Sequence, residues 1–213
     1  MRFSALFLLA FALNGASAQT LLKPDAAKLA AVGPDSFDVK FATSRGEFLV
    51  RIRRGWSPRG ADRLYYLFNA HFYDGIAFYR VVSGFMAQFG AHGDPKVAAA
   101  WFDRGIRDEP PKMSNTRGTL TFANRGPNTR STQLFINFGN NAQLDGMGFA
   151  PLGSVVSGMA VVDSLYKGYG EGAPRGTGPD QDLIARQGNA YLHKAFPKLD
   201  SIVTARVAKE WKR

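Results

Sequence analysis

The alternation of hydrophobic and polar residues predicts a pair of strands near the start of the chain. Within residues 36–42, Phe37, Val39 and Phe41 alternate with charged or small residues. A period of two residues is typical of a strand that buries one face. Residues 48–53 repeat this alternation after a short turn that contains glycine. The two segments therefore predict a β-hairpin.

A helix is predicted directly after this hairpin. Ser57 is a favoured N-cap residue, and Pro58 is favoured at the first helical position. Ala61, Leu64 and Phe68 follow at helical spacing. We therefore expect a helix that begins at Pro58.

The rest of the chain predicts short strands separated by loops. Residues 73–90 mix aromatic, β-branched and glycine residues, which is typical of short strands with bends. Residues 91–117 contain three prolines and no sustained period, so we predict a long loop there. Many short strands without alternating βα units indicate a single, mainly β domain, as a barrel or a sandwich. Further predicted elements are strands over residues 118–123, 133–138, 149–156 and 199–207, a short helix that starts at residues 157–159, and a loop over residues 168–179 with a helical piece after it.

Composition narrows the chemistry that the chain can perform. The chain has 213 residues, of which 45% are hydrophobic and 21% are charged, as is typical of a soluble globular domain. It has no cysteine, which excludes disulfides, cysteine-ligated zinc and thiol nucleophiles. His71, His92 and His193 fit neither a hydrolase triad nor a metal motif, so we interpret them as surface or packing residues. We expect no metal and no cofactor.

The first residues predict an export signal. Residues 1–18 contain one arginine, an apolar run and the small residues Ala16-Ser17-Ala18, which is the layout of a cleavable signal peptide. The apolar run is shorter than a membrane span needs. We therefore expect an exported protein without a membrane span. The predicted segments are a signal peptide at 1–18, an N-terminal lead at 19–35, one domain at 36–207 and a basic tail at 208–213.

The charge balance raises the question of an acidic partner. The chain has 27 Lys and Arg against 17 Asp and Glu, a net charge of +10. In the tail, Lys209, Lys212 and Arg213 surround Trp211, a composition that can hold nucleic acid or anionic lipid. The chain carries no signature of a nucleic-acid-binding fold, and a solvated basic terminus is the simpler interpretation. We therefore do not expect nucleic acid as a partner.

Two segments in the middle of the chain carry a specific pattern. Residues 78–88 read FYRVVSGFMAQ, and residues 122–136 read FANRGPNTRSTQLFI. Both closely resemble the signature regions of cyclophilin-type peptidyl-prolyl cis-trans isomerases. The resemblance also covers the opening hairpin, the helix after it, the turn at Leu144-Asp145-Gly146, residues 153–159 and the closing strand. Two long motifs in the order and spacing of the family make the resemblance specific.

This resemblance implies a closed eight-stranded antiparallel β-barrel capped by two α-helices, with the active site on the outer face of the barrel. It implies an enzyme that rotates X-Pro peptide bonds in proline-containing polypeptides, here assisting the folding of exported proteins, and we expect a monomer. The signal peptide and the short segment at residues 91–117 resemble bacterial exported members of the family, so we expect a periplasmic or secreted protein. The alternative is a binding module that holds proline-containing segments in the same groove without turnover.

The family pattern also assigns site residues by position. Arg80 matches the catalytic arginine, and Gln88 is expected to orient it. Seen one by one, the apolar residues could belong to the core, Arg80 could be a solvated strand arginine, and Asn124 could be a turn former. Their joint occurrence in one family pattern favours a site. The pocket and substrate-contact positions of the family match Phe85, Met86, Ala123, Asn124, Gln133, Phe135, Leu144 and Phe149.

The chemistry of the implied reaction suits these residue types. Rotation about an X-Pro bond crosses a barrier of about 20 kcal/mol that amide resonance creates, and no covalent bond breaks. An apolar pocket can hold the pyrrolidine ring while polar groups hold the flanking backbone. A guanidinium directed at the prolyl nitrogen stabilises the twisted transition state more than the planar ground state. Arg80 suits this role because it is charged at any working pH.

The sequence departs from the family pattern at residues 143–152. Gln143 occupies the position where many members have a tryptophan associated with cyclosporin binding, so we expect weak cyclosporin binding. The pocket histidine of the family is also missing, and we expect Phe149 to supply an aromatic wall in its place. Residues 168–198 are longer than the barrel needs, and the sequence assigns them no role.

Overall fold

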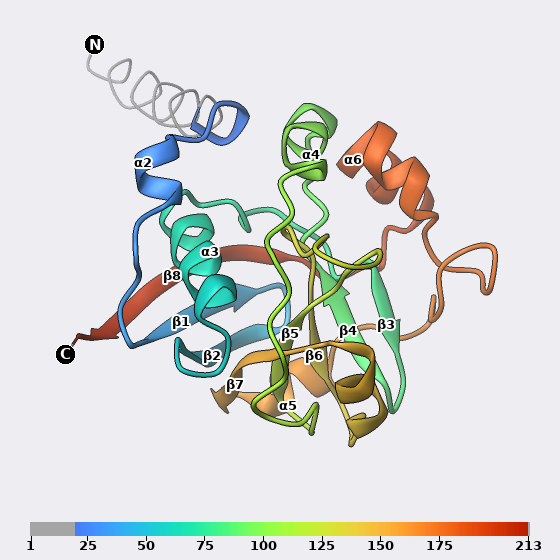
Figure 1. Cartoon of the computed structure of the whole chain (residues 1–213). Coiled ribbons are helices and arrows are strands. Elements are labelled where there is room, and N and C mark those ends of the chain that lie inside the picture. Colours follow the sequence, from blue (N-terminus) through green and yellow to red (C-terminus); the bar gives the residue numbers. More distant parts are fainter. Residues whose placement is uncertain (1–19, 213) are drawn as a thin grey trace, which may run out of the picture.

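All eight strands of the fold lie in one antiparallel sheet (Figure 1). The computed structural model describes residues 20–212, so the predicted signal peptide lies outside the described residues. The strands are β1 (Ser36–Thr43), β2 (Gly46–Arg53), β3 (Arg80–Val82), β4 (Met86–Phe89), β5 (Thr119–Phe122), β6 (Leu134–Asn137), β7 (Pro151–Ser157) and β8 (Ile202–Trp211). The helices are α2 (Ala26–Leu29), α3 (Pro58–Asn69), α4 (Pro95–Phe102), α5 (Met159–Asp163) and α6 (Gln181–Ala195), together with the 3-10 helix η1 (Ala142–Met147).

The sheet curls into a half-barrel, whereas the family resemblance implied a closed barrel. Its strand order is β3-β4-β6-β5-β7-β2-β1-β8, which leaves β3 and β8 as edge strands. The two ends approach each other just before these strands, where Ala77 and Ser201 form an isolated bridge. An ion pair of 2.6 Å between Asp74 and Arg206 also connects the two segments. In the described part of the chain, these contacts and the backbone hydrogen bonds that flank the bridge join the two ends, and no strand ladder forms between them.

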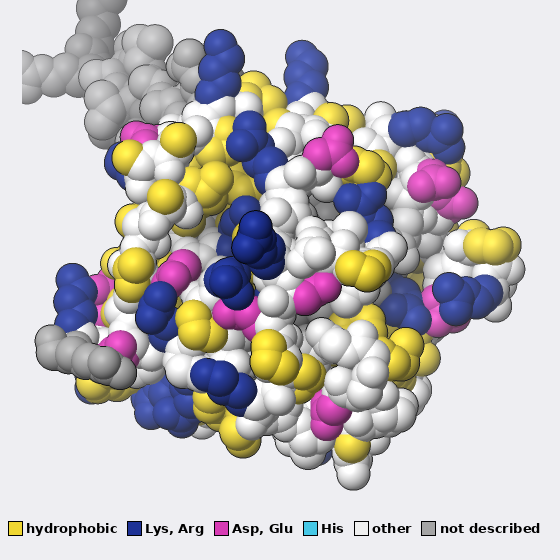
Figure 2. Space-filling model, in the orientation of Figure 1, with side chains coloured by type: hydrophobic (Ala, Val, Ile, Leu, Met, Phe, Trp, Pro, Cys, Tyr) yellow, Lys and Arg dark blue, Asp and Glu magenta, His cyan; other side chains and the backbone are white. Residues whose placement is uncertain are grey.

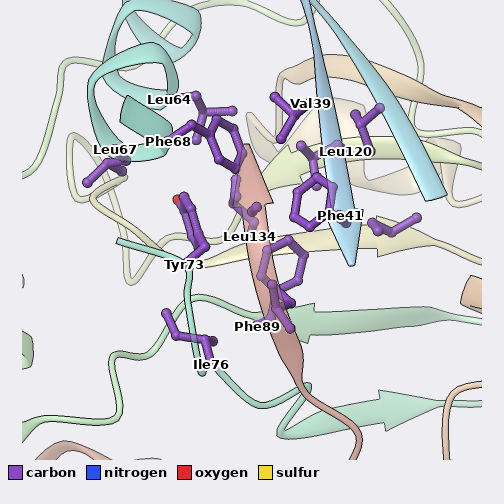
Figure 3. Packing of buried hydrophobic residues seen from close by; sticks show 14 of the residues in the cluster. Val39, Phe41, Leu64, Leu67, Phe68, Tyr73, Ile76, Phe89, Leu120 and Leu134 are labelled. Carbon is purple, nitrogen blue, oxygen red and sulfur yellow. The ribbon is translucent and has the colours of Figure 1, made fainter. Parts of the chain in front are cut away.

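The hairpin of β1 and β2 buries the face that its alternating pattern predicts. The register pairs Phe37 with Ile52 and Phe41 with Phe48. Phe37, Val39 and Phe41 are fully buried. Figure 3 shows Val39 and Phe41 facing side chains that come from α3 and from other strands of the sheet. The predicted hairpin is therefore confirmed.

Two helices pack on the sheet, which agrees with the predicted number of capping helices. The helix α3 contacts β2 and β8, and α5 contacts β2. Leu64, Leu67 and Phe68 of α3 are fully buried, and Figure 3 shows them among the core side chains. The helices α4 and α6 pack against each other (Figure 1), and Trp101 of α4 also belongs to the main core.

The helix α3 begins at Pro58, as predicted, but the side chain of Ser57 does not cap it. The Ser57 hydroxyl donates instead to the carboxylate of Glu109. The same carboxylate accepts the backbone N–H groups of Arg59 at 2.8 Å and Gly60 at 3.1 Å. The first N–H groups of a helix lack partners within the helix, and the helix dipole favours a negative charge there. A carboxylate that is distant in sequence thus replaces the predicted serine cap.

Glu109 is the centre of a buried charge cluster. Its carboxylate lies 3.2 Å from the guanidinium of Arg130, and the two side chains are 7% and 1% exposed. Arg130 also lies 3.4 Å from the carboxylate of Asp108 and donates to the carbonyl of Arg107. Buried charges are stable only when they are paired and hydrogen-bonded. The cluster therefore ties the segment before β5 to the start of α3.

Residues 91–117 are not the continuous loop that we predicted, because they contain α4. Asp94 caps this helix and Pro95 takes its first position, and both residue types are common helix-start signals. Trp101 is 1% exposed, and its indole N–H donates to the carbonyl of Leu21 at 2.9 Å. The helix has only eight residues, too few for a sustained hydrophobic period. This shortness explains why periodicity did not predict it.

The strand β8 extends beyond the predicted end at residue 207. Its last residues, which we predicted as a basic tail, pair with the start of β1, so that Trp211 lies opposite Ser36. The ring of Trp211 lies 4.5 Å from the guanidinium of Arg51 and 4.8 Å from the ammonium of Lys209. Trp211 therefore packs against side chains of β2 and β8.

Positive charge is spread over the face of the molecule that Figure 2 shows. Figure 2 shows Lys and Arg side chains across the visible face, with acidic side chains between them.

None of the helices within residues 20–212 combines the length and the apolar character that crossing a membrane requires. Over the same residues, no three His, Cys, Asp or Glu side chains are grouped in a way that could hold a metal ion.

Candidate active site

Three neighbouring strands place the predicted catalytic pair on the outer face of the sheet. The register pairs Arg80 of β3 with Gln88 of β4, and Gln88 with Phe135 of β6. Alternate residues of a strand point to opposite faces. Val81 and Ala87, which flank this row in sequence, belong to the main core on the other face. The proximity of Arg80, Gln88 and Phe135 therefore follows from the strand register.

A cavity of about 810 Å³ opens over this row. It is lined by every residue that the family pattern assigned to the site, although these residues come from strands, from η1 and from the connecting loops. The structure thus brings the predicted residues together in one place. They are Arg80, Phe85, Met86, Gln88, Ala123, Asn124, Gln133, Phe135, Leu144 and Phe149.

One side of the cavity is apolar. Met86, Phe135 and Leu144 are 2%, 5% and 8% exposed. They form a cluster of their own, separate from the main core, with Phe85 and Phe149 packed beside them. The rings of Phe135 and Phe149 meet edge to face with 5.8 Å between centroids. These side chains therefore form an apolar wall of the cavity.

A buried amide holds the segment that carries Leu144 and Phe149. Asn115 is fully buried, and its side-chain N–H groups donate to the carbonyl of Phe149 and to the carboxylate of Asp145, both at 2.7 Å. Its carbonyl oxygen accepts the hydroxyl of Thr121 at 2.8 Å. Sequence analysis missed Asn115, because a lone asparagine in a loop indicates only a turn. Its bonds fix the segment in which the sequence departs from the family pattern.

A chain of hydrogen bonds crosses the polar side of the cavity. Nη1 of Arg80 donates to Oε1 of Gln88 at 2.9 Å, and Nε2 of Gln88 donates to Oε1 of Gln133 at 3.2 Å. The hydroxyl of Tyr79 donates to the same Gln133 oxygen at 2.7 Å. Burial raises the pKa of Tyr79, so its hydroxyl remains a donor at neutral pH. Tyr79 was not among the predicted site residues, since an aromatic residue in a strand indicates core packing.

Arg80 has an acidic partner that the sequence did not predict. Its Nε donates to Oε1 of Glu171 at 2.6 Å, and its Nη2 donates to Oε2 at 2.7 Å. The two side chains are 19% and 33% exposed. The hydrogen bonds from Arg80 lower the pKa of Glu171 despite partial burial, so the carboxylate is ionised at neutral pH. The two residues are 91 positions apart, and no local pattern could pair them.

Ala123 and Asn124 line the cavity just after β5. The N–H of Ala123 donates to the carbonyl of Gln133 at 2.9 Å, which continues the pairing of β5 with β6. The side-chain oxygen of Asn124 accepts the N–H of Gly126 at 3.2 Å. Asn124 is thus a turn former, as its residue type suggests, and it lines the cavity as well.

The cavity extends beyond the predicted residues into the space between α4 and α6. Ala98 and Phe102 of α4 and Ile184 of α6 line this part. His92 also lines it and packs on Phe72 with 5.0 Å between ring centroids. Burial lowers the pKa of His92, so its ring is neutral at neutral pH. The sequence does not predict this extension, because the pattern of residues 91–117 indicates a loop and not α4.

Comparison with known proteins identifies relatives of one kind. A family profile described as Cyclophilin type peptidyl-prolyl cis-trans isomerase/CLD matches residues 38–185. Peptidyl-prolyl cis-trans isomerase CYP18-1 of Arabidopsis thaliana is 34% identical over 137 residues, which cover 61% of this chain and 82% of that protein. Peptidyl-prolyl cis-trans isomerase-like 3 of Homo sapiens is 30% identical over 132 residues, which cover 61% and 81%.

A solved structure shares the fold. The crystal structure of a Cryptosporidium parvum cyclophilin type peptidyl-prolyl cis-trans isomerase matches with a TM-score of 0.61 and 19% identity. The match covers 82% of this chain and 99% of that one. A second structure of the same protein, obtained in the presence of the dipeptide Ala-Pro, matches with a TM-score of 0.60, also at 19% identity.

Proposed function

The chain belongs to the cyclophilin-type peptidyl-prolyl cis-trans isomerase family, and we propose that Arg80 and Gln88 are its catalytic residues. It catalyses rotation about X-Pro peptide bonds. One observation carries the proposed assignment: the guanidinium of Arg80 lies beside the apolar wall, with its Nη1 3.9 Å from Sδ of Met86 and its Cζ 5.7 Å from the ring centroid of Phe85. We also propose that the protein acts as a monomer on proline-containing polypeptides.

The apolar wall provides a place for the proline ring. Met86, Phe135 and Leu144 are almost fully buried and present carbon and sulfur atoms to the cavity. A pyrrolidine ring held there leaves water, and the peptide on both sides of it lies along the polar rim. Asn124 and Gln133 line the cavity, and we propose that the backbone of Asn124 and the side-chain amide of Gln133 bind that peptide. Holding both flanks lowers the entropy lost when the bond twists.

Arg80 acts on the nitrogen of the twisting bond. In the planar amide the prolyl nitrogen shares its lone pair with the carbonyl, and in the twisted amide the lone pair is localised. An N–H directed at this lone pair binds the twisted state better than the planar one, which is the condition for catalysis. Gln88 keeps the guanidinium in place through the 2.9 Å hydrogen bond. The reaction needs no nucleophile, because no covalent bond breaks.

The test of this proposal is an exchange measurement on a short peptide that contains Ala-Pro. We expect the wild-type protein to accelerate cis-trans exchange, measured by NMR, and Arg80→Ala to lose most of the acceleration. Equal acceleration by both proteins would remove Arg80 from the mechanism. If neither protein accelerates exchange but both suppress the aggregation of an unfolded client, the groove serves binding without turnover.

We further propose that the protein is of the bacterial exported type and assists the folding of exported proteins. The support is the order of charge, apolar run and small residues in 1–18. Expressed in a bacterium with its full sequence, the protein is expected in the periplasm with Gln19 as its first residue, by N-terminal sequencing. Leu8→Arg interrupts the apolar run and is expected to keep the chain in the cytoplasm. An exported chain that still begins at Met1 would contradict cleavage.

Weak cyclosporin binding is expected from Gln143. This residue lies in η1 with an exposed side chain, so it offers an amide to solvent where the drug-binding members have an indole. We expect a dissociation constant above about 1 µM by calorimetry. Gln143→Trp is expected to tighten binding about tenfold or more, since burial of a large apolar side chain contributes about 1.5–3 kcal/mol and about 1.4 kcal/mol corresponds to a factor of ten. A submicromolar constant for the wild type would show that the drug needs no tryptophan here.

A further inference from the structure

The glycine-rich loop between α5 and α6 forms a part of the site that the family pattern does not explain. It docks on the free edge of β3, where Val81 and Gly170 form an isolated antiparallel bridge. The next residue is Glu171, whose carboxylate accepts two hydrogen bonds from Arg80. The bridge places Gly170 opposite the strand neighbour of Arg80. Docking of the loop and pairing of Glu171 with Arg80 are therefore one structural feature.

The loop is folded tightly around the backbone of Glu171. Gly178 donates its N–H to the carbonyl of Glu171 at 2.9 Å, and Gly172 and Gly178 form an isolated parallel bridge. A Cβ at Gly176 would lie 2.3 Å from the same carbonyl oxygen, so this position requires glycine. The carboxylate also accepts the N–H of Gly172 at 3.0 Å. Several backbone contacts thus fix the position from which Glu171 reaches into the site.

The hydrogen bonds of Arg80 leave little freedom to its guanidinium. A guanidinium has five N–H donors. Glu171 accepts two of them, Gln88 accepts one, and Sδ of Met86 lies at 3.9 Å from Nη1 as a weak fourth acceptor. Within residues 20–212, the second N–H of Nη2 has no hydrogen-bond partner. The group is held from two sides and keeps one donor for a ligand.

We infer that Glu171 is a positioning residue for Arg80 in the isomerase reaction, an inference that rests on the proposed role of Arg80. Rotation about the X-Pro bond forms no ion, so the site needs a directed N–H more than it needs net charge. A free arginine side chain samples many rotamers, and a displacement of about 1 Å can lower a rate by up to about 100-fold. A carboxylate that binds both Nε and Nη2 selects one orientation.

The test compares Glu171→Gln with a matched control. The glutamine keeps the size of the side chain and one acceptor oxygen, but it loses the charge and the second acceptor. We expect kcat/KM to fall about 5- to 20-fold, with peptide affinity changed less than about twofold, because orientation and not binding is affected. The control is Asp163→Asn. Asp163 forms an equally bidentate pair with Arg117, at 2.6 and 3.0 Å, outside the cavity, and we expect no change in rate.

Two further measurements separate positioning from a general structural role. In an Arg80→Ala background, Glu171→Gln is expected to have no additional effect, since its influence passes through Arg80. In NMR spectra of arginine side chains, the Nε–H signal of Arg80 is expected to be sharp in the wild type and broadened by solvent exchange in Glu171→Gln.

Three outcomes would overturn the inference. The first two are a Glu171→Gln protein that is as active as the wild type and one that is more active. The third is a Glu171→Gln substitution that lowers the activity of the Arg80→Ala protein by the same factor as it lowers that of the wild type. Failure of the proposed function is distinguishable from these, because it would show already in the comparison of the wild type with Arg80→Ala.

Discussion

Arg80→Ala is expected to lower kcat/KM for an X-Pro peptide by about 100- to 1000-fold, the loss that follows removal of one preorganised donor from a dry site. The folded protein should be little affected. Arg80 is 19% exposed and its main partner Glu171 is 33% exposed, so the carboxylate left behind can be hydrated. We expect the free energy of unfolding to change by about 1 kcal/mol or less. The loss of rate therefore reports on chemistry and not on folding.

The Arg80→Lys variant tests whether the positive charge of Arg80 is sufficient for activity. Lysine keeps the charge but presents it as a flexible point without the planar fork that Glu171 and Gln88 hold. If a directed N–H is what the reaction needs, Arg80→Lys is expected to lose most of the activity as well. Near-normal rates for the lysine variant would show that charge alone suffices. Rates would be measured by NMR exchange, and urea unfolding would verify the fold.

Glu109→Ala is expected to destabilise the protein by about 3–5 kcal/mol, the usual effect of removing one partner from a buried ion pair. It leaves Arg130, which is 1% exposed, without its most buried counter-charge. It also leaves two N–H groups at the start of α3 without their acceptor. Urea denaturation gives the free energy directly. The matched control is Glu47→Ala, which breaks an exposed pair with Lys40 and is expected to change stability by less than about 1 kcal/mol.

The same carboxylate makes stability depend on pH. Burial raises the pKa of Glu109, but the hydrogen bonds from Ser57 and from the two backbone N–H groups, with the charge of Arg130, lower it by more. Because the folded pKa is below that of the unfolded chain, this contribution is complete above the ordinary carboxyl range. It is lost as the pH falls through the lowered value. Glu109→Gln is expected to remove this acid-dependent part of the unfolding free energy. An unchanged pH dependence would show that Glu109 does not titrate with folding.

The strands could be predicted where their signal is local. Alternation in residues 36–42 and 48–53 marks β1 and β2, because a half-buried strand imposes a period of two on any sequence. The absence of a ladder between β3 and β8 in the described residues could not be predicted in this way. Whether β3 and β8 form a ladder depends on residues more than 120 positions apart, such as Asp74 and Arg206, and nothing local reports their distance.

The residues of the site can be separated in the same way, into those that a sequence pattern predicts and those that it does not. A pattern in two motifs placed Arg80, Gln88 and Phe135 in one cavity, because strand register brings them into a row. Glu171 carries no signal of its own, since one acidic residue among glycines is typical of any solvated loop. The sequence does not predict Glu109 as the acceptor at the start of α3 for a related reason. Ser57, the residue before this helix, already satisfies the sequence rule for a cap. In both cases, the acidic partner comes from a loop whose course the sequence does not specify.

The position of β8 in the sheet means that the sheet can be completed only when residues 202–211 are present. β1 lies between β2 and β8, and the helix α3 packs on β8, yet β8 contains residues 202–211. Until those residues have been synthesised, β1 presents an unpaired edge that can pair with other chains. Contacts between such distant segments also form slowly. The edge of β1 therefore stays open to other chains until β8 has docked, and pairing with residues 202–211 covers it.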